Sequence, residues 1–85
     1  MNPRNYFVYL LECADGTYYT GYTTDLSRRL AEHNAGKASR YTRGRLPVKL
    51  LYQETLPNKR LAMQREYRIK QLKRKEKEGL CKISP

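Results

Sequence analysis

Two ionisable side chains lie on the face of a predicted helix that should be hydrophobic. Leu26 and Leu30 define that face. On a wheel of about 100° per residue, Arg29 and His33 both fall within about 60° of Leu26. A guanidinium there is costly unless it is paired, so the pattern indicates either a reactive site or an arginine that follows the edge of the face to water. A structural role is open for His33 as well, but the two side chains together favour a site.

Glu66 holds a similar position in a second, longer helix. It lies at the border of the apolar face, roughly 60° from Ile69 on the same kind of wheel. It is also the only acidic residue between Glu54 and Glu76, within a strongly basic segment. A carboxylate in this place is a candidate metal ligand, and an ordinary ion pair with Lys70, four residues on, is the alternative.

Tyrosine is used in an unusual proportion, with eight tyrosines and one phenylalanine in the chain. The N-terminal segment carries five of them: Tyr6, Tyr9, Tyr18, Tyr19 and Tyr22. Strand propensity and half-buried packing explain most of these positions. The alternatives with a function are stacking on nucleic-acid bases and chemistry of the phenol hydroxyl.

The chain is short and basic. Its 85 residues predict one domain over 1–85, with a core at about 4–79 and a loose C-terminal tail at 80–85. A net charge of +10 indicates a polyanionic partner, for which nucleic acid and an anionic membrane surface are the two candidates.

Several classes of protein are excluded by composition. No apolar run reaches the length of a membrane span, and no signal-peptide cleavage pattern follows the N-terminus. Cys13 and Cys81 are far apart and there is a single histidine, so neither a disulfide scaffold nor a zinc finger is predicted. A cytoplasmic protein is expected.

The elements that must position these side chains follow from the pattern of apolar residues. We predict an α+β fold: a small three-stranded antiparallel sheet flanked by helices, in the order β-β-α-β-α with a short C-terminal helix. Thr24 or Asp25 is predicted to cap the first helix and Gly36 to end it. The predicted segments are strands at 5–13, 17–22 and 48–55, a first helix up to Gly36, a basic loop at 37–47, a helix at 59–74, and a short helix with a loose tail in 75–85.

The length of the first turn decides which tyrosines share a face. With a two-residue turn at Asp15-Gly16, Tyr9 would lie opposite Tyr22. With a three-residue loop at 14–16 and Gly16 left-handed, Tyr9 would lie opposite Gly21 and Tyr19 would face the same way. Our hypothesis is the three-residue loop.

Taken in order, these residues resemble the GIY-YIG nuclease domain, over about residues 4–79. The resemblance is carried by Phe7-Val8-Tyr9, Tyr19-Thr20-Gly21, Asp25-Leu26 followed by Arg29 and His33, and Gln64-Arg65-Glu66-Tyr67. Each tripeptide by itself is weak evidence, whereas the ordered set with its spacings is specific. The sequence is most similar to the small, stand-alone, largely uncharacterised bacterial members.

The resemblance implies phosphodiester hydrolysis with one divalent ion, Mg²⁺ or Mn²⁺, held by Glu66. It further implies that Arg29 contacts the scissile phosphate, with Tyr9 as candidate general base and Tyr19 as a second phenol. His33 would act as an auxiliary acid/base or orienting group. A free phenol has a pKa of about 10 and an imidazole one of about 6.5, so His33 is the easier base and the choice between it and Tyr9 stays open.

The sequence also departs from the family pattern. The first tripeptide lacks the glycine of the family, and Thr20 replaces isoleucine in the second. Tyr22 stands where some members carry a lysine, which removes one cation from the site. We expect no accessory DNA-binding domain, and therefore low sequence specificity.

The leading prediction is a metal-dependent DNA endonuclease, with single-stranded or branched DNA among its substrates. The alternative is a nucleic-acid-binding module, for DNA or structured RNA, with little or no catalysis; a membrane-surface role ranks last. Basic side chains with an interleaved tyrosine suit phosphate contacts without sequence readout. The predicted nucleic-acid contacts are Lys37, Arg40, Tyr41, Arg43, Arg45, Arg65 and Lys70. The oligomeric state is left open, a monomer included.

Overall fold

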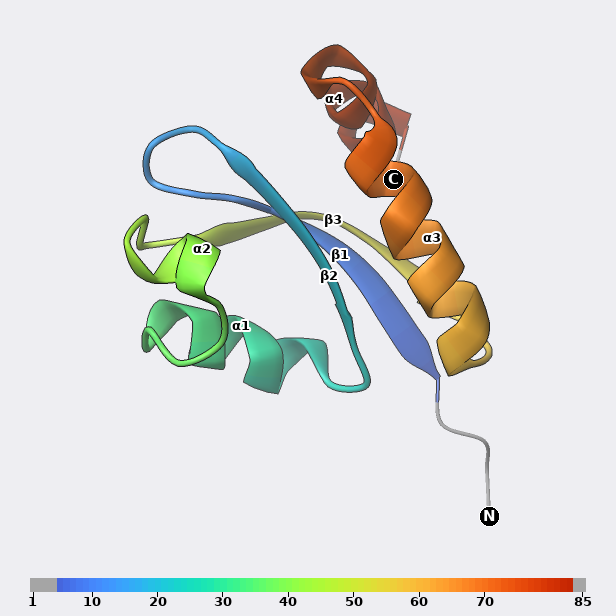
Figure 1. Cartoon of the computed structure of the whole chain (residues 1–85), viewed down its shortest axis with the longest axis horizontal. Coiled ribbons are helices and arrows are strands. Elements are labelled where there is room, and N and C mark those ends of the chain that lie inside the picture. Colours follow the sequence, from blue (N-terminus) through green and yellow to red (C-terminus); the bar gives the residue numbers. More distant parts are fainter. Residues whose placement is uncertain (1–4, 84–85) are drawn as a thin grey trace.

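The computed structural model describes residues 5–83 and contains one three-stranded antiparallel sheet with helices on both faces (Figure 1). The strands are β1 (Tyr6–Glu12), β2 (Tyr18–Thr23) and β3 (Lys49–Leu56), in the order β2-β1-β3. The predicted fold class is confirmed. β2 is therefore an edge strand, and β1 is the central one.

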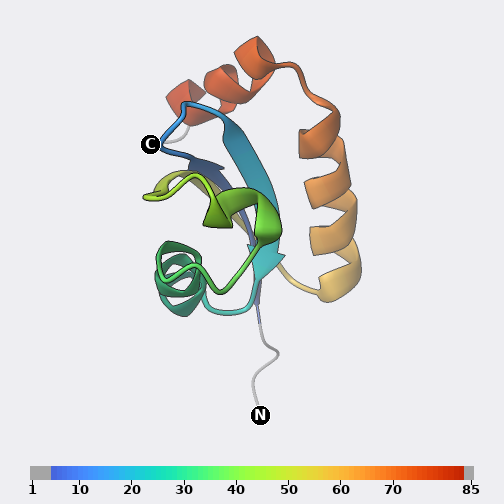
Figure 2. The same cartoon turned by 60° about the vertical axis from the view of Figure 1, so that its left-hand side comes forward.

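The central strand is apolar on nearly every residue because helices cover both faces of the sheet. The short helices α1 (Leu26–Asn34) and α2 (Arg40–Arg43) lie on one side, and α3 (Lys59–Gln71) lies on the other (Figure 2). Tyr9 and Leu11 belong to the hydrophobic cluster on the α1 side. Val8 packs with Ala62 and Ile69 on the α3 side.

The hairpin between β1 and β2 has the three-residue loop. Tyr9 pairs with Gly21, and Leu11 pairs with Tyr19. Gly16 has a φ of +84°, which is the left-handed conformation that glycine adopts without strain. The predicted register is confirmed, so Tyr9 and Tyr19 face the same side of the sheet.

Side-chain caps begin the two helices that carry the candidate residues. Asp25 accepts a hydrogen bond from the Arg28 amide at 3.0 Å and caps α1, as predicted. Asn58 accepts one from the Leu61 amide at 2.9 Å and caps α3. Gly36, with a φ of +77°, follows the end of α1.

The segment predicted as a basic loop contains a helix. Residues 40–43 form α2, capped by Ser39, whose hydroxyl accepts from the Tyr41 amide at 3.1 Å. Gly44 ends this helix. Basic composition concealed a short capped turn, because one turn of helix is too short to produce a hydrophobic period.

The C-terminal segment is also more ordered than predicted. The long helix ends at Gln71 rather than 74, and α4 (Arg74–Ile83) follows it. A loose tail from residue 80 is therefore wrong for 80–83, while 84–85 lie outside the described residues. Leu80 packs on the cluster of Val8, Ala62 and Ile69, which gives this end of the chain a reason to be ordered.

Arg74 attaches α4 to the hairpin. Its Nη1 donates to the Gly16 carbonyl at 2.7 Å, and its guanidinium lies 4.5 Å from the centre of the Tyr18 ring. Glu78, one turn later, pairs with Arg74 at 3.3 Å. The contacts of Arg74 with Gly16 and Tyr18 were not visible in the sequence because they join residues almost sixty positions apart.

Replacing Ile69 by alanine tests the packing of α3 on the sheet. Ile69 is fully buried, so Ile69→Ala should lower the free energy of unfolding by about 2–5 kcal/mol. Met63→Ala is the matched control on the same helix, because Met63 is 48% exposed and should change it by less than about 0.5 kcal/mol. Urea denaturation measures both, and equal losses would contradict this packing.

Candidate active site

A pocket of about 320 Å³ opens at the edge strand β2, where four elements meet. β1 contributes Tyr9, α1 contributes Arg29 and α3 contributes Glu66. β2 itself contributes Tyr19, Gly21 and Tyr22. Four of the five candidate catalytic residues therefore line one cavity, although they come from positions 9 to 66 of the chain.

Tyr9 reaches this pocket by lying across Gly21. A β-carbon placed on Gly21 would be 2.5 Å from the Tyr9 hydroxyl oxygen and 2.7 Å from the ring carbon that bears it. No side chain fits there unless the tyrosine moves. The absent side chain of Gly21 thus makes the space through which a phenol from the central strand reaches the edge.

His33, the fifth candidate, lies behind Tyr9 and does not line the pocket. It is fully buried, and its Nε2 is 2.9 Å from the Tyr9 hydroxyl. Its Nδ1 is 2.9 Å from the hydroxyl of Thr42 in α2. His33 is therefore a buried histidine with both ring nitrogens hydrogen-bonded, and it also positions the phenol that lines the pocket. The structural and the functional interpretation of His33 are compatible.

Arg29 presents an unused donor to the site. Its Nη1 donates to Glu32 at 3.2 Å, and its side chain is 35% exposed. Its Nε is buried and has no hydrogen-bond partner within residues 5–83. Because buried donors are nearly always paired, this N–H is suited to an anion that enters the pocket.

Glu66 is partly buried, with 20% of its side chain exposed. Its Oε2 lies 3.7 Å from the Lys70 ammonium, so the ordinary ion pair that the sequence suggested is formed. The same carboxylate also lines the pocket with Tyr9 and Arg29. The two interpretations of Glu66 are therefore compatible.

Comparison with known proteins identifies this arrangement. The GIY-YIG catalytic domain matches residues 5–79 of the chain. The chain belongs to the GIY-YIG family. Membership places it in a family of nucleases, whose substrates are nucleic acids and which typically depend on a divalent metal.

Relatives of similar length come from archaea and bacteria. A UPF0213 protein from Halobacterium salinarum is 64% identical over 73 residues, which are 86% of this chain and 95% of the relative. A UPF0213 protein from Bacillus pumilus is 53% identical over 78 residues, covering 92% and 80%.

Solved structures show the same fold. The solution NMR structure of a UPF0213 protein from Bacillus halodurans is 49% identical, has a TM-score of 0.61, and is matched over 94% of this chain and 85% of that one. A solution NMR structure of a protein from E. faecalis is 40% identical, with a TM-score of 0.64 and coverages of 95% and 86%.

The GIY-YIG pocket offers one carboxylate to a metal. Within residues 5–83, no three His, Cys, Asp or Glu side chains cluster closely enough to form a metal site. Glu66 is the sole carboxylate that lines the pocket. Magnesium is commonly held by one or two carboxylates together with water and substrate phosphates, so this donor set fits such an ion.

Burial keeps both the phenol and the imidazole neutral. It raises the pKa of Tyr9, and the Arg29 guanidinium beside the hydroxyl opposes the rise only in part. Burial, helped by the positive charge of Arg29, lowers the pKa of His33 below its ordinary value of 6.5. The site by itself does not ionise Tyr9, as a general base acting alone would require.

The residues predicted to contact nucleic acid fall into groups with different surroundings. Tyr41 stacks on Tyr19 with ring centres 6.0 Å apart, and Arg45 lies 4.1 Å over the Tyr41 ring while pairing with Asp15 at 3.0 Å. These three form a column of stacked side chains that begins at the pocket.

Arg65 is turned away from the pocket. It donates three hydrogen bonds, of 2.7, 2.9 and 2.7 Å, to Glu54 of β3. It is not among the residues that line the cavity. Lys70 lies beside the pocket through its pair with Glu66. Lys37, Arg40 and Arg43 are exposed, on or before α2.

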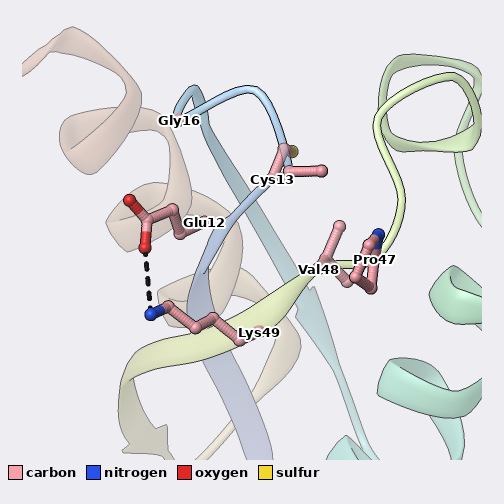
Figure 3. A pocket seen from close by; sticks show the side chains of 7 residues that line it. Glu12, Cys13, Gly16, Pro47, Val48 and Lys49 are labelled. Carbon is pink, nitrogen blue, oxygen red and sulfur yellow. Dashed lines mark ion pairs between the residues drawn. The ribbon is translucent and has the colours of Figure 1, made fainter.

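A second hollow of about 320 Å³ lies at the hairpin end of the sheet (Figure 3). Glu12 and Lys49 line it and form an ion pair of 3.4 Å, which Figure 3 marks. Its charges compensate each other, in contrast to the buried Nε of Arg29.

None of the helices between residues 5 and 83 has the length and apolar character that a bilayer span requires.

Thr42 and Tyr22 were not among the predicted site residues. Tyr22 was noted as one of the clustered tyrosines and as a replacement for lysine, but not as a site residue, yet it lines the pocket. Thr42 contacts His33 from a helix that was not predicted. A serine and a glycine five residues apart, Ser39 and Gly44, were the capping signals that could have revealed this helix.

Gly21→Ala tests the close approach of Tyr9. The new methyl group must displace the phenol, so we expect a loss of about 1–3 kcal/mol in the free energy of unfolding and a shifted His33 imidazole resonance. Gly44→Ala is the control, because nothing lies within 4 Å of its added β-carbon. Identical spectra of the two variants would contradict the proposed clash.

Proposed function

We propose that this protein is a divalent-metal-dependent endonuclease that hydrolyses DNA phosphodiester bonds with low sequence specificity. Single-stranded or branched DNA is included among its substrates. The observation that carries the proposal is the pocket in which Tyr9, Arg29 and Glu66 converge, with an unpartnered buried Nε on the arginine. A negatively charged phosphate suits a cavity that offers a hydrogen-bond donor and a carboxylate able to bind a metal ion.

Glu66 is the residue that would hold Mg²⁺ or Mn²⁺. Such an ion, when bound, polarises a phosphate oxygen and stabilises the leaving oxygen. Glu66 would exchange its contact with Lys70 for the cation at little cost in free energy, because Lys70 is half exposed and the pair is long, at 3.7 Å. Lys70 would then be free to contact the nucleic-acid backbone.

Arg29 binds the scissile phosphate. Its Nη1 is occupied by Glu32, which orients the guanidinium and leaves the buried Nε for a phosphate oxygen. Donors fixed before the substrate arrives stabilise developing negative charge without reorganisation. Tyr19, the second phenol of the pocket, donates to another phosphate oxygen or to the attacking water.

Tyr9 and His33 together remove the proton from the attacking water. The water gives its proton to the Tyr9 oxygen while the Tyr9 proton moves to Nε2 of His33, 2.9 Å away. The hydroxide equivalent forms a bond to phosphorus while the bond from phosphorus to the leaving oxygen breaks. The leaving alkoxide takes a proton from solvent water, and the imidazole becomes imidazolium. The raised pKa of Tyr9 is no obstacle, because the phenol never has to be ionised before the reaction.

Low specificity follows from the kind of contacts available. The exposed side chains of Lys37, Arg40 and Arg43 suit backbone phosphates, which carry no sequence information. We include Tyr41 and Arg45 in this surface because their column extends outward from Tyr19. Arg65 contributes by orienting α3 through Glu54 rather than by direct contact.

A nucleic-acid-binding module without useful catalysis is the second candidate. The observation in its favour is the pairing of Glu66 with Lys70, which neutralises the one carboxylate of the pocket. Such a module would bind DNA or structured RNA equally well with and without a divalent ion.

Glu66→Gln decides between the two candidates. With labelled single-stranded, duplex and branched DNA in Mg²⁺ or Mn²⁺, we expect wild-type cleavage and a loss of at least about a hundredfold in the variant, with binding kept. Glu12→Gln is the matched control, since Glu12 is also partly buried and paired with a lysine, at 3.4 Å. Equal cleavage by the Glu66 variant defeats the metal assignment, and binding without cleavage by any protein supports the module.

The pH dependence of cleavage should report on His33. Only the neutral imidazole accepts a proton, and the pKa of His33 lies below 6.5. The rate should therefore be constant above pH 6.5 and should decrease only at lower pH. The folded state also loses stability over the same acidic range, because the unfolded chain binds this proton more tightly. Rates are therefore compared where circular dichroism shows a folded protein; an acidic midpoint at or above 6.5 contradicts the assignment.

A further inference from the structure

We propose that Thr42 fixes the tautomer of His33, with the proton on Nδ1, so that Nε2 is a bare acceptor aimed at Tyr9. Thr42 is in this account a positioning residue of the site. The tautomer follows from the geometry alone. Its consequence for catalysis rests on the proposed hydrolytic function.

The first step concerns the proton of the Tyr9 hydroxyl. Within the described residues, this hydroxyl has one hydrogen-bond partner, Nε2 of His33 at 2.9 Å. Of the other groups that act on it, the Arg29 guanidinium carries donors and no acceptor, and Tyr19 and Glu66 act on it through their charges and not through a hydrogen bond. The Tyr9 proton therefore points to Nε2, and Nε2 carries no proton of its own.

The second step follows the other ring nitrogen. A neutral imidazole without a proton on Nε2 must carry it on Nδ1, and Nδ1 lies 2.9 Å from the Thr42 hydroxyl oxygen. That hydroxyl also lies 3.4 Å from the carbonyl oxygen of Ser39, to which it donates. With its proton directed to a carbonyl, the Thr42 oxygen is free to accept from His33. In this series of three hydrogen bonds, the proton of each donor is directed from Tyr9 towards the Ser39 carbonyl.

The third step is that no other group can replace Thr42. Both Thr42 and His33 are fully buried, so solvent does not offer Nδ1 an alternative partner. The short helix α2 holds Thr42 in place, because Ser39 caps it and the Arg45 amide donates to the Thr42 carbonyl at 2.8 Å. Orientation of a functional imidazole by a second hydrogen bond at its far nitrogen is a common arrangement.

The opposite tautomer would prevent the proposed reaction. With the proton on Nε2, His33 would donate to the Tyr9 oxygen and could not accept the proton of Tyr9. The phenol would then have no route by which to remove a proton from water. Thr42 thus affects the rate of the chemical step and not the binding of DNA.

The wild-type protein provides the direct test. Long-range ¹H–¹⁵N NMR of the imidazole at neutral pH should show a protonated Nδ1 and an unprotonated Nε2 for the single histidine. A dominant Nε2–H tautomer, or an imidazolium, would overturn the proposal. This measurement needs neither DNA nor metal, so it stands even when no cleavage is found and the proposed function fails.

Variants at Thr42 test its role. Thr42→Val keeps the shape and removes the hydroxyl, and we expect a mixed tautomer with kcat reduced roughly ten- to a hundredfold and KM for DNA unchanged. Thr42→Ser should restore both the tautomer and most of kcat. A Thr42→Val protein with the wild-type tautomer and rate would overturn the proposal. So would equal loss in the serine variant.

Thr20→Val is the matched control. Thr20 is also a buried threonine, 3% exposed, but its hydroxyl has no hydrogen-bond partner within the described part of the chain. Its replacement should leave the His33 tautomer unchanged. A tautomer change of the same size in Thr20→Val would show that any buried cavity disturbs His33, which would also contradict a specific role for Thr42.

Discussion

The hydrogen bond between Tyr9 and His33 is the contact on which the rest of the site depends. It joins the central strand to α1 across 24 positions of sequence, between two side chains that are almost wholly buried. An unpaired buried hydroxyl or imidazole would be costly, so the strand, α1 and α2 are held in one relative arrangement by the need to satisfy both groups. The same contact sets the direction of the phenol that lines the pocket.

The electrostatics of the pocket follow from a division between buried and half-exposed groups. Tyr9 and His33 are kept neutral by burial, whereas the Arg29 guanidinium and the Glu66 carboxylate are half-buried groups that line the pocket. In a chain of net charge +10, the pocket is lined by a carboxylate as well as by a guanidinium. Such a separation of neutral groups from charged groups would suit the proposed hydrolysis of a phosphodiester.

Much of the fold and of the candidate site was predictable because it depends on short-range patterns. The left-handed Gly16 set the hairpin register, and the register placed Tyr9 over Gly21. Helical spacing placed Arg29 and His33 together. The helix α2 escaped prediction because one basic turn has no apolar period. A short helix after the long one was predicted, but the helical order of residues 80–83 was not, because the packing of Leu80 is tertiary.

Local spacing in the sequence by itself determined which side chains share a strand face or a helix face, and therefore which residues were candidates for a site. Only the tertiary structure decided that Glu66 of α3 and Arg29 of α1, from opposite sides of the sheet, meet at the edge of β2. It also decided that His33 lies behind Tyr9 rather than in the pocket. The physical reason is that periodicity specifies direction around one element, whereas the distance between elements is set by the packing of side chains far apart in sequence.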